Sequence, residues 1–303
     1  MLNVKVRAYA LTITLFLACP SIPKAQEFYT ADQLKQEYQE VLHLAGKQQY
    51  DKAIQGLKRI IEKEPSFCGG YLKLVEIHKY KSAVSNAREY FKELITRDPK
   101  NANAYHGLGL VYHDQGDFQQ SIENFRKSID LGNRCASIYK DIVDAYAESH
   151  DLDGAIDYLN KLARVQWKNE GVYCGLGYAY ARQKHWEQAL VALEKALRLN
   201  PNLSVAYLEK QNIYYKLGKL QEALEVNQVG YKLAESSHEV ELQHRFLSGR
   251  AVILKRLGRH QEAQQSIEEA LAIAGQIGDL RSEGKYLGNR GAISSSVADY
   301  QKA

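Results

Sequence analysis

The chain has 303 residues, of which 45% are hydrophobic and 25% are charged, and its formal net charge is +4. This balance is that of a globular protein and excludes a fibrous or intrinsically disordered chain. Lys5, Arg7 and Lys24 lie within the first 25 residues, so the remainder carries +1 (4 − 3). So small a charge gives little attraction for nucleic acid, and we expect no nucleic-acid partner.

The N-terminal segment has the pattern of a secretory signal. Lys5 and Arg7 precede an apolar run at 8–18, which is followed by prolines and small residues. The run is shorter than the ~20 residues of a membrane span. We therefore predict a signal peptide at 1–25, a lead-in at 26–33, and export to the periplasm or the outside of a bacterial cell. An uncleaved anchor is a further alternative.

A second interpretation of the same segment involves a lipid. The letters "FLAC" at 16–19 resemble a bacterial lipoprotein cleavage box, in which Cys19 would be the lipidated residue. Apart from the uncleaved anchor, this is the only route by which we expect the chain to associate with a membrane.

From residue 34 onward, aromatic and small residues recur with a period of 34. The aromatic series is Tyr71, Tyr105, Tyr139, Tyr173 and Tyr207, and the small series is Ala53, Ala87, Ser121, Ala155, Ala189 and Ala223. A fixed period of this size indicates a solenoid of stacked repeats.

One unit, residues 173–201, shows the local structure. Its apolar positions at 173, 176, 177 and 180 share one helix face. A second helix is expected from about Glu187, and Pro201 ends it. Gly177 and Ala189 are small, which predicts that the two helices cross at short range.

This pattern resembles the tetratricopeptide repeat, a helix–turn–helix unit of 34 residues. The resemblance implies an all-α superhelix built from antiparallel helix pairs. The predicted repeats are 34–67, 68–101, 102–135, 136–169, 170–203 and 204–237, then a longer variant at 244–277 and a partial unit at 284–303. The longer spacing follows from Ala263 and Ala303, each 40 residues after the preceding small position.

Two repeats depart from the pattern. The first has Glu37 and Glu40 at positions that are usually apolar, so we expect an irregular end unit. The sixth has Gln211, Asn227 and Gly230, together with a lysine at 210, where apolar residues are usual. We therefore expect the sixth repeat to be the loosest, or to contact something polar.

Catalytic and metal-binding patterns are weak, so we expect no enzyme activity, cofactor or metal. His106 and His113 share one helix face and are interpreted as polar groove lining. Asp141 and Asp144 are interpreted as solvated residues of an exposed helix face.

The cysteines lie in different repeats. Cys68 and Cys135 are about two repeats apart, which predicts a separation too large for a disulfide, whose Cα atoms must lie within ~7 Å. Isolated thiols are the expected state, and a regulatory thiol at Cys174 is the alternative.

In the family that the chain resembles, the first helix of each repeat lines a concave groove that binds an extended peptide or a helix of a partner. The resemblance places the groove at Tyr38, Leu42, Leu72, Glu76, His106, Leu110, Lys140, Asp144, Cys174, Tyr178, Leu208 and Asn212. The family's carboxylate clamp is absent, because Lys140 is paired with Asp144 where the clamp has asparagine.

Two interpretations of the groove remain open. Leu42, Leu72, Leu110, Tyr178 and Leu208 either supply apolar anchors for a partner segment or pack against neighbouring first helices. The predicted function is an exported protein-interaction scaffold. The alternatives are the repeat portion of a larger effector or enzyme, since the last repeat is incomplete, and an envelope assembly lipoprotein.

Overall fold

The computed structural model describes residues 29–133, 135 and 137–302, with side chains described as far as residue 295. The signal peptide predicted at 1–25, and with it Cys19, therefore falls outside the described residues. Within the described ranges all regular structure is helical. The helices are α1 (Ala31–Gly46), α2 (Tyr50–Lys63), α3 (Cys68–Tyr80), α4 (Val84–Arg97), α5 (Ala102–Asp114), α6 (Phe118–Asp130), α7 (Ile138–Glu148), α8 (Leu152–Val165), α9 (Glu170–Arg182), α10 (Trp186–Leu199), α11 (Ser204–Lys216), α12 (Leu220–Ser236), α13 (Val240–Arg256), α14 (His260–Ile277) and α15 (Leu280–Lys302).

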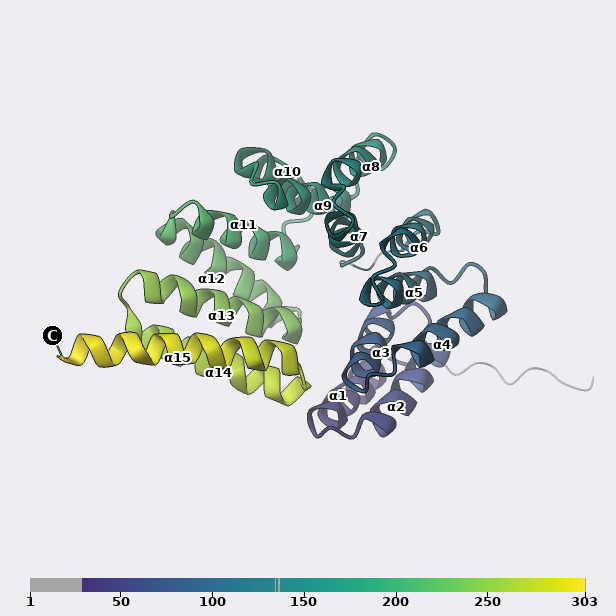
Figure 1. Ribbon diagram of the computed structural model, residues 1–303, viewed down its shortest axis with the longest axis horizontal. Coiled ribbons are helices and arrows are strands. Elements are labelled where there is room, and N and C mark those ends of the chain that lie inside the picture. The colour runs from purple at the N-terminus through teal and green to yellow at the C-terminus, as the bar shows by residue number, and fades with distance from the viewer. Residues whose placement is uncertain (1–28, 134, 136, 303) are drawn as a thin grey trace, which may run out of the picture.

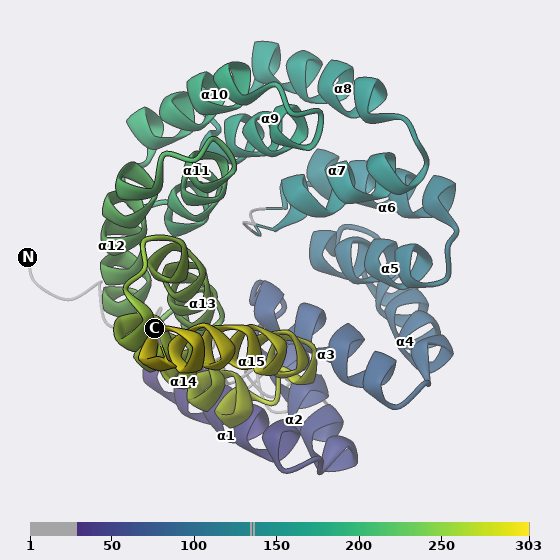
Figure 2. The same ribbon diagram turned by 60° about the vertical axis from the view of Figure 1, so that its left-hand side comes forward.

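The helices form two concentric layers. Odd-numbered helices line the inside of a curved superhelix and even-numbered helices cover its outside, as Figures 1 and 2 show. Each helix packs against its neighbours in sequence, and successive inner helices such as α7 and α9 also touch. The predicted all-α superhelix of antiparallel pairs is confirmed. The longer helices begin earlier than the predicted units at 244 and 284, because α13 and α15 start at 240 and 280.

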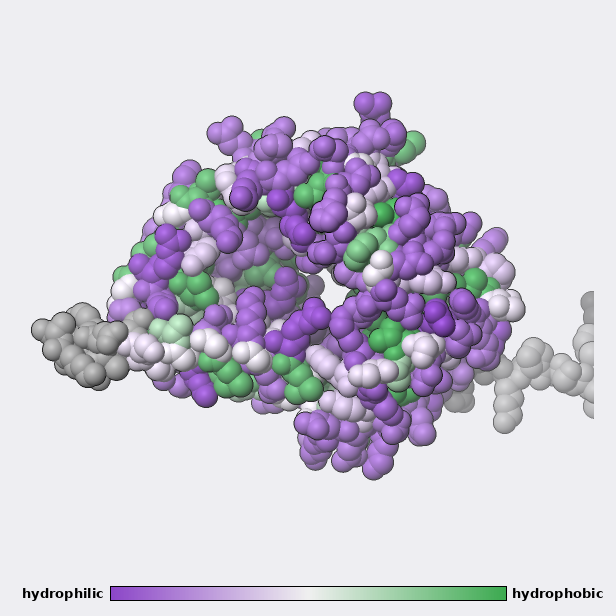
Figure 3. All heavy atoms as spheres, in the orientation of Figure 1, coloured by the Kyte–Doolittle hydropathy of each residue, from purple (hydrophilic) through white to green (hydrophobic). Residues whose placement is uncertain are grey.

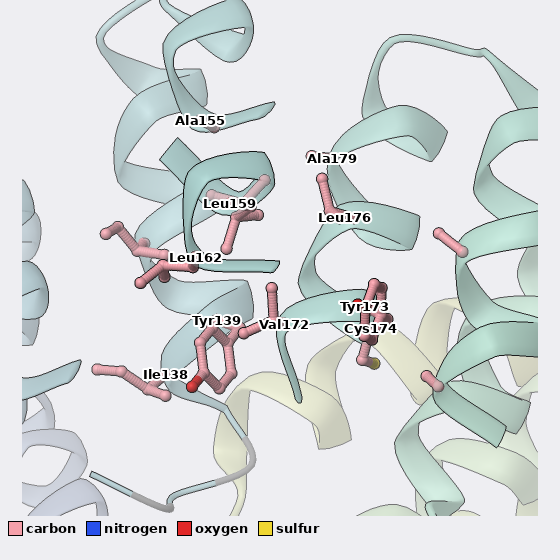
Figure 4. Close-up of a cluster of buried hydrophobic side chains, with 14 of the residues drawn as sticks. Ile138, Tyr139, Ala155, Leu159, Leu162, Val172, Tyr173, Cys174, Leu176 and Ala179 are labelled. Carbon is pink, nitrogen blue, oxygen red and sulfur yellow. The ribbon is translucent and has the colours of Figure 1, made fainter. Parts of the chain in front are cut away.

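The small residues allow the two layers to approach closely. A Cβ at Gly177 would lie 2.6 Å from Cγ of Leu193 and 3.2 Å from the carbonyl oxygen of Ala189. Ala189 itself is fully buried. The close crossing predicted within this repeat is therefore confirmed. Figure 4 shows the adjoining core, in which Leu159, Val172 and other side chains of α7 to α9 interdigitate.

The sixth repeat contains a buried polar contact of its own. Nδ2 of Asn227 donates to Oε1 of Gln211 at 2.6 Å and to the carbonyl oxygen of Phe246 at 2.8 Å. Gly230 leaves room for the Phe246 ring, since a Cβ there would lie 2.3 Å from Cζ. The unusual residues of this repeat thus contact polar groups of the same chain. Lys210 instead forms an ion pair with Glu194 at 3.6 Å.

The two ends of the superhelix meet. Helix α1 packs against α14, and both views place them side by side. A Cβ at Gly46 would lie 3.0 Å from the carbonyl oxygens of Gly275 and Gln276, so the backbones are in close contact. Tyr38 also reaches Glu241 with its hydroxyl, at 3.5 Å. The superhelix is therefore closed into a ring around a central opening, which is visible in Figure 3.

The last helix is packed rather than isolated. Tyr286 and Ile293 of α15 are buried in a cluster with α13 and α14. The Tyr286 hydroxyl also hydrogen-bonds Nδ1 of His244 at 2.9 Å. Among the described residues, no helix is both long and apolar enough to cross a bilayer.

Candidate protein-binding surface

The predicted groove residues lie on the inner helices, but four of them are buried. Leu42, His106, Cys174 and Leu208 expose between 1 and 8% of their surface. Leu42 and Leu208 thus offer almost no apolar surface, and the expectation that they are available as anchors is wrong. The reason is curvature, which presses the inner helices of a tight superhelix against one another.

The remaining apolar candidates are half-buried. Leu110 packs against two core clusters. This favours the interpretation that Leu110 packs between first helices over the interpretation that it is an anchor for a partner. Leu72 is likewise half-buried, and Tyr38 packs edge-on against Phe67 with ring centroids 4.9 Å apart. Asn212 alone among the twelve is exposed.

The charged candidates neutralise one another. Asp144 forms an ion pair with Lys140, accepts a hydrogen bond from the Tyr178 hydroxyl at 2.6 Å, and contacts Arg182 at 3.0 Å. The interpretation of Asp144 as a solvated carboxylate is therefore wrong. Glu76 is half-buried and pairs with Lys73 at 2.8 Å; burial raises the pKa of Glu76, although Lys73 opposes this.

His106 is buried and pairs with the half-buried Asp141. Nε2 of His106 lies 2.8 Å from Oδ2 of Asp141, and the ring packs edge-on against Phe125. Burial lowers the pKa of His106, but the hydrogen bond to Asp141 and the contact with Cys135 outweigh it and raise the pKa to about 9. Asp141 is not the solvated carboxylate expected from sequence, and His106 is too buried to be the polar groove lining expected of it. His113 lies farther along α5, half-buried against Phe118.

Two cysteines belong to neighbouring segments of the inner layer. Cys135, in the linker between α6 and α7, has its Sγ 3.6 Å from the Ser137 hydroxyl, and Cys68 and His106 lower the pKa of its thiol, which burial opposes. Both cysteines are free thiols, and the expectation that their separation is too large for a disulfide stays a prediction.

A cleft opens next to Cys135. It has a volume of about 580 Å³ and lies among the linker and the loops that lead into α9 and α11. Its lining is Asn133, Cys135, Tyr139, Val165, Gln166, Trp167, Lys168, Asn169, Glu170, Gly171, Cys174, Leu203 and Val205. Val165 and Trp167, in the α8–α9 region, are 78% and 59% exposed. We call this the aromatic cleft.

Sequence periodicity did not find Val165 or Trp167, because both fall at the junction between repeats. The signal was nevertheless present. The segment "RVQWKN" carries Trp167 where the junctions "TRDPKN" and "RLNPNL" carry proline.

A second cleft of about 310 Å³ lies between α11, α13 and α15. Its walls include Lys216, Arg245 and Lys285, together with the amides of Asn212 and Asn289. No carboxylate is among the thirteen residues that line it. We call this the basic cleft; it contains Leu208 and Asn212 of the predicted groove.

No cluster of three or more His, Cys, Asp or Glu suited to a metal ion occurs in the part of the chain that the structure describes.

Comparison with known proteins supports the repeat architecture. Tetratricopeptide repeat models match residues 90–123, 172–203 and 244–277. No curated protein matches the chain.

Solved structures with the same fold come from distant proteins. Yeast Tom70 is 16% identical, with a TM-score of 0.62 over 82% of this chain and 50% of its own length. A tetratricopeptide repeat protein from Parabacteroides merdae is 13% identical, with a TM-score of 0.51 over 84% of this chain and 99% of its own. A thermophilic repeat protein from Thermus thermophilus is 20% identical, with a TM-score of 0.50 over 62% and 98%. At these identities the likeness concerns the fold alone.

Proposed function

The chain is a tetratricopeptide repeat protein, and from this premise we propose that it is an interaction scaffold that binds a segment of a partner protein at the inner face of its ring. The observation that carries the proposal is the aromatic cleft. Trp167 and Val165 are large apolar side chains at its mouth, and both are more than half exposed. Exposed aromatic residues at the edge of a concave site are typical of the anchors that dominate protein interfaces.

The lining of the basic cleft bears on the charge of the partner segment. Three cations line it without a carboxylate, and two asparagine amides stand beside them. Asparagine side chains hydrogen-bond the backbone of a peptide, while the cations favour acidic side chains. We therefore propose a partner segment with an apolar residue for the aromatic cleft and acidic residues for the basic cleft.

Export is part of the proposal. The basic, apolar and small-residue regions at 1–25 support secretion, with lipidation at Cys19 as the alternative. Fractionation of cells that express the tagged chain tests this. A Cys19→Ala change leaves the location unchanged for a secreted protein and releases a lipoprotein from the membrane fraction. Membrane release would favour the envelope assembly alternative, and retention in the cytoplasm would contradict export.

The experiment for partner binding compares two surface changes. Trp167→Ser with Val165→Ser removes the anchors of the aromatic cleft, whereas Val191→Ser removes a 64% exposed apolar residue from the outer helix α10. Crosslinked proteins are purified from cells with each tagged variant and quantified. We expect specific partners to be lost about tenfold with the cleft variant and retained with the control, because an interface anchor is worth more than 1.4 kcal/mol. Equal recovery would contradict the proposal.

A further inference from the structure

The aromatic cleft and the basic cleft share one wall, which is helix α11. Val205, near the N-terminal end of α11, lines the aromatic cleft, whereas Leu208, Asn212 and Lys216 line the basic cleft. These four residues follow one another at spacings of three and four, so they lie on one face of the helix. The two clefts are therefore consecutive sections of one surface on the inner face of the ring.

A small hollow lies between the two clefts. It shares Tyr139, Cys174 and Val205 with the aromatic cleft, and it reaches Glu209, the neighbour of Leu208 on α11. Its volume of about 10 Å³ has room for no more than one water molecule. A bound segment must therefore cross this hollow, whereas each cleft is large enough to hold a side chain.

The length of α11 between the clefts sets the spacing of the groups that a ligand must carry. The helix rises by ~10 Å from Val205 to Asn212 and by ~16 Å from Val205 to Lys216, at ~1.5 Å per residue. An extended chain advances ~3.3 Å per residue, so about three to five of its residues cover this distance. A helical segment would need about seven to eleven residues.

The groups around the basic cleft favour an extended segment that carries negative charge. Lys216, Arg245 and Lys285 come from three different helices, and in the described part of the chain none of them is held in an ion pair. Their charges are therefore available to an acidic side chain of a partner. The amides of Asn212 and Asn289 can pair with backbone N–H and C=O groups, which an extended segment leaves free and a helix satisfies internally.

The hollow does not share this preference for negative charge. Lys140 lines it but is already paired with Asp144, and Glu209 adds a buried carboxyl group. An acidic residue of the partner is therefore favoured over the basic cleft and not over the hollow, which fixes its position along the segment.

We propose that the partner segment binds along α11 as an extended chain, with a large apolar side chain in the aromatic cleft and an acidic side chain, four residues away, in the basic cleft. The inference rests on the proposed function, to which it adds the conformation of the ligand and the spacing of its two anchors. Small side chains fit best between the anchors, because the hollow has no room for large ones.

The first test uses synthetic peptides, so it does not depend on the identity of the cellular partner. Fluorescently labelled peptides of glycine and serine carry one phenylalanine and one glutamate, placed one, four or eight positions apart and in both chain directions. In at least one direction, fluorescence anisotropy should give the spacing of four a dissociation constant about tenfold below those of the other two. Tightest binding at a spacing of one or eight, equal affinity at all three spacings, or no measurable binding would overturn the inference.

The second test asks whether the basic cleft holds the glutamate. Lys216→Ala with Lys285→Ala removes two exposed cations of the basic cleft, and Lys219→Ala with Lys232→Ala makes the same change of charge outside it. The cleft variant should bind the peptide with the spacing of four about tenfold more weakly, and no better than the matching glutamine peptide, whereas the control should keep the wild-type affinity. Equal losses in the two variants would overturn the inference. A cellular partner that is captured at the inner face but lacks this spacing would also overturn it and would leave the proposed function standing, so the two fail separately.

Discussion

The buried amide contact of the sixth repeat allows a quantitative prediction. Asn227 and Gln211 are 1% and 2% exposed, and Nδ2 of Asn227 bonds Oε1 of Gln211 at 2.6 Å. Gly249 makes room for the Gln211 amide, since a Cβ there would lie 2.2 Å from Nε2. Asn227→Leu keeps the branching of the side chain, although leucine is larger, and leaves the buried Gln211 oxygen without its donor. We expect a loss of about 2 kcal/mol, because an unsatisfied buried acceptor costs ~1–3 kcal/mol.

A second substitution should restore the stability that Asn227→Leu removes. In the double variant Asn227→Leu with Gln211→Met, both partners are apolar, so most of the stability should return and the coupling energy should be about 1–2 kcal/mol. Urea unfolding followed by circular dichroism measures each variant, and Gln228→Leu on the exposed face of α12 is the matched control. Equal midpoints for Asn227→Leu and Gln228→Leu, or purely additive effects in the cycle, would refute the reasoning.

Three further predictions concern packing, closure and thiol reactivity. Ala189→Leu should cost ~1–3 kcal/mol by overpacking the crossing of α9 and α10, whereas Gln188→Leu should cost little; matching melting temperatures would contradict the assigned register. Gly46→Leu should separate α1 from α14, so hydrogen exchange in α1 should accelerate while α9 stays protected; unchanged protection would argue against the closed ring. Below pH 7, iodoacetamide should modify Cys135 well before Cys174. The pKa of the Cys135 thiol is lowered, which favours its thiolate, whereas the pKa of the Cys174 thiol is raised, which suppresses its thiolate. Similar rates for the two cysteines would contradict this.

The sequence predicted the helix pairs well because their packing is local. Tyrosine and alanine positions 34 residues apart report contacts within one repeat and between adjacent repeats, so the buried Ala189 and the nearby Gly177 could be placed without coordinates. Curvature is different, since it accumulates from small rotations between repeats. The contact of α1 with α14 depends on that sum, and the periodic pattern does not contain it.

The binding surface was predicted only in part for the same reason. The inner helices were identified, but the degree of burial of Leu42 and Leu208 depends on how tightly the ring curves. Trp167 lies at a junction between repeats, where the family pattern prescribes no apolar residue, and a search for departures from the usual junction would have found it.

The central proposal is that a partner segment binds at the inner face of the ring, and site-specific photocrosslinking tests it most directly. A photoreactive phenylalanine analogue is placed in cells at position 167 or 212 for the two clefts, and at position 191 or 229 for the exposed outer helices. The account predicts discrete crosslinked products of the same partner from 167 and 212 and none of that partner from 191 and 229. Crosslinks to that partner confined to 191 and 229 would contradict it.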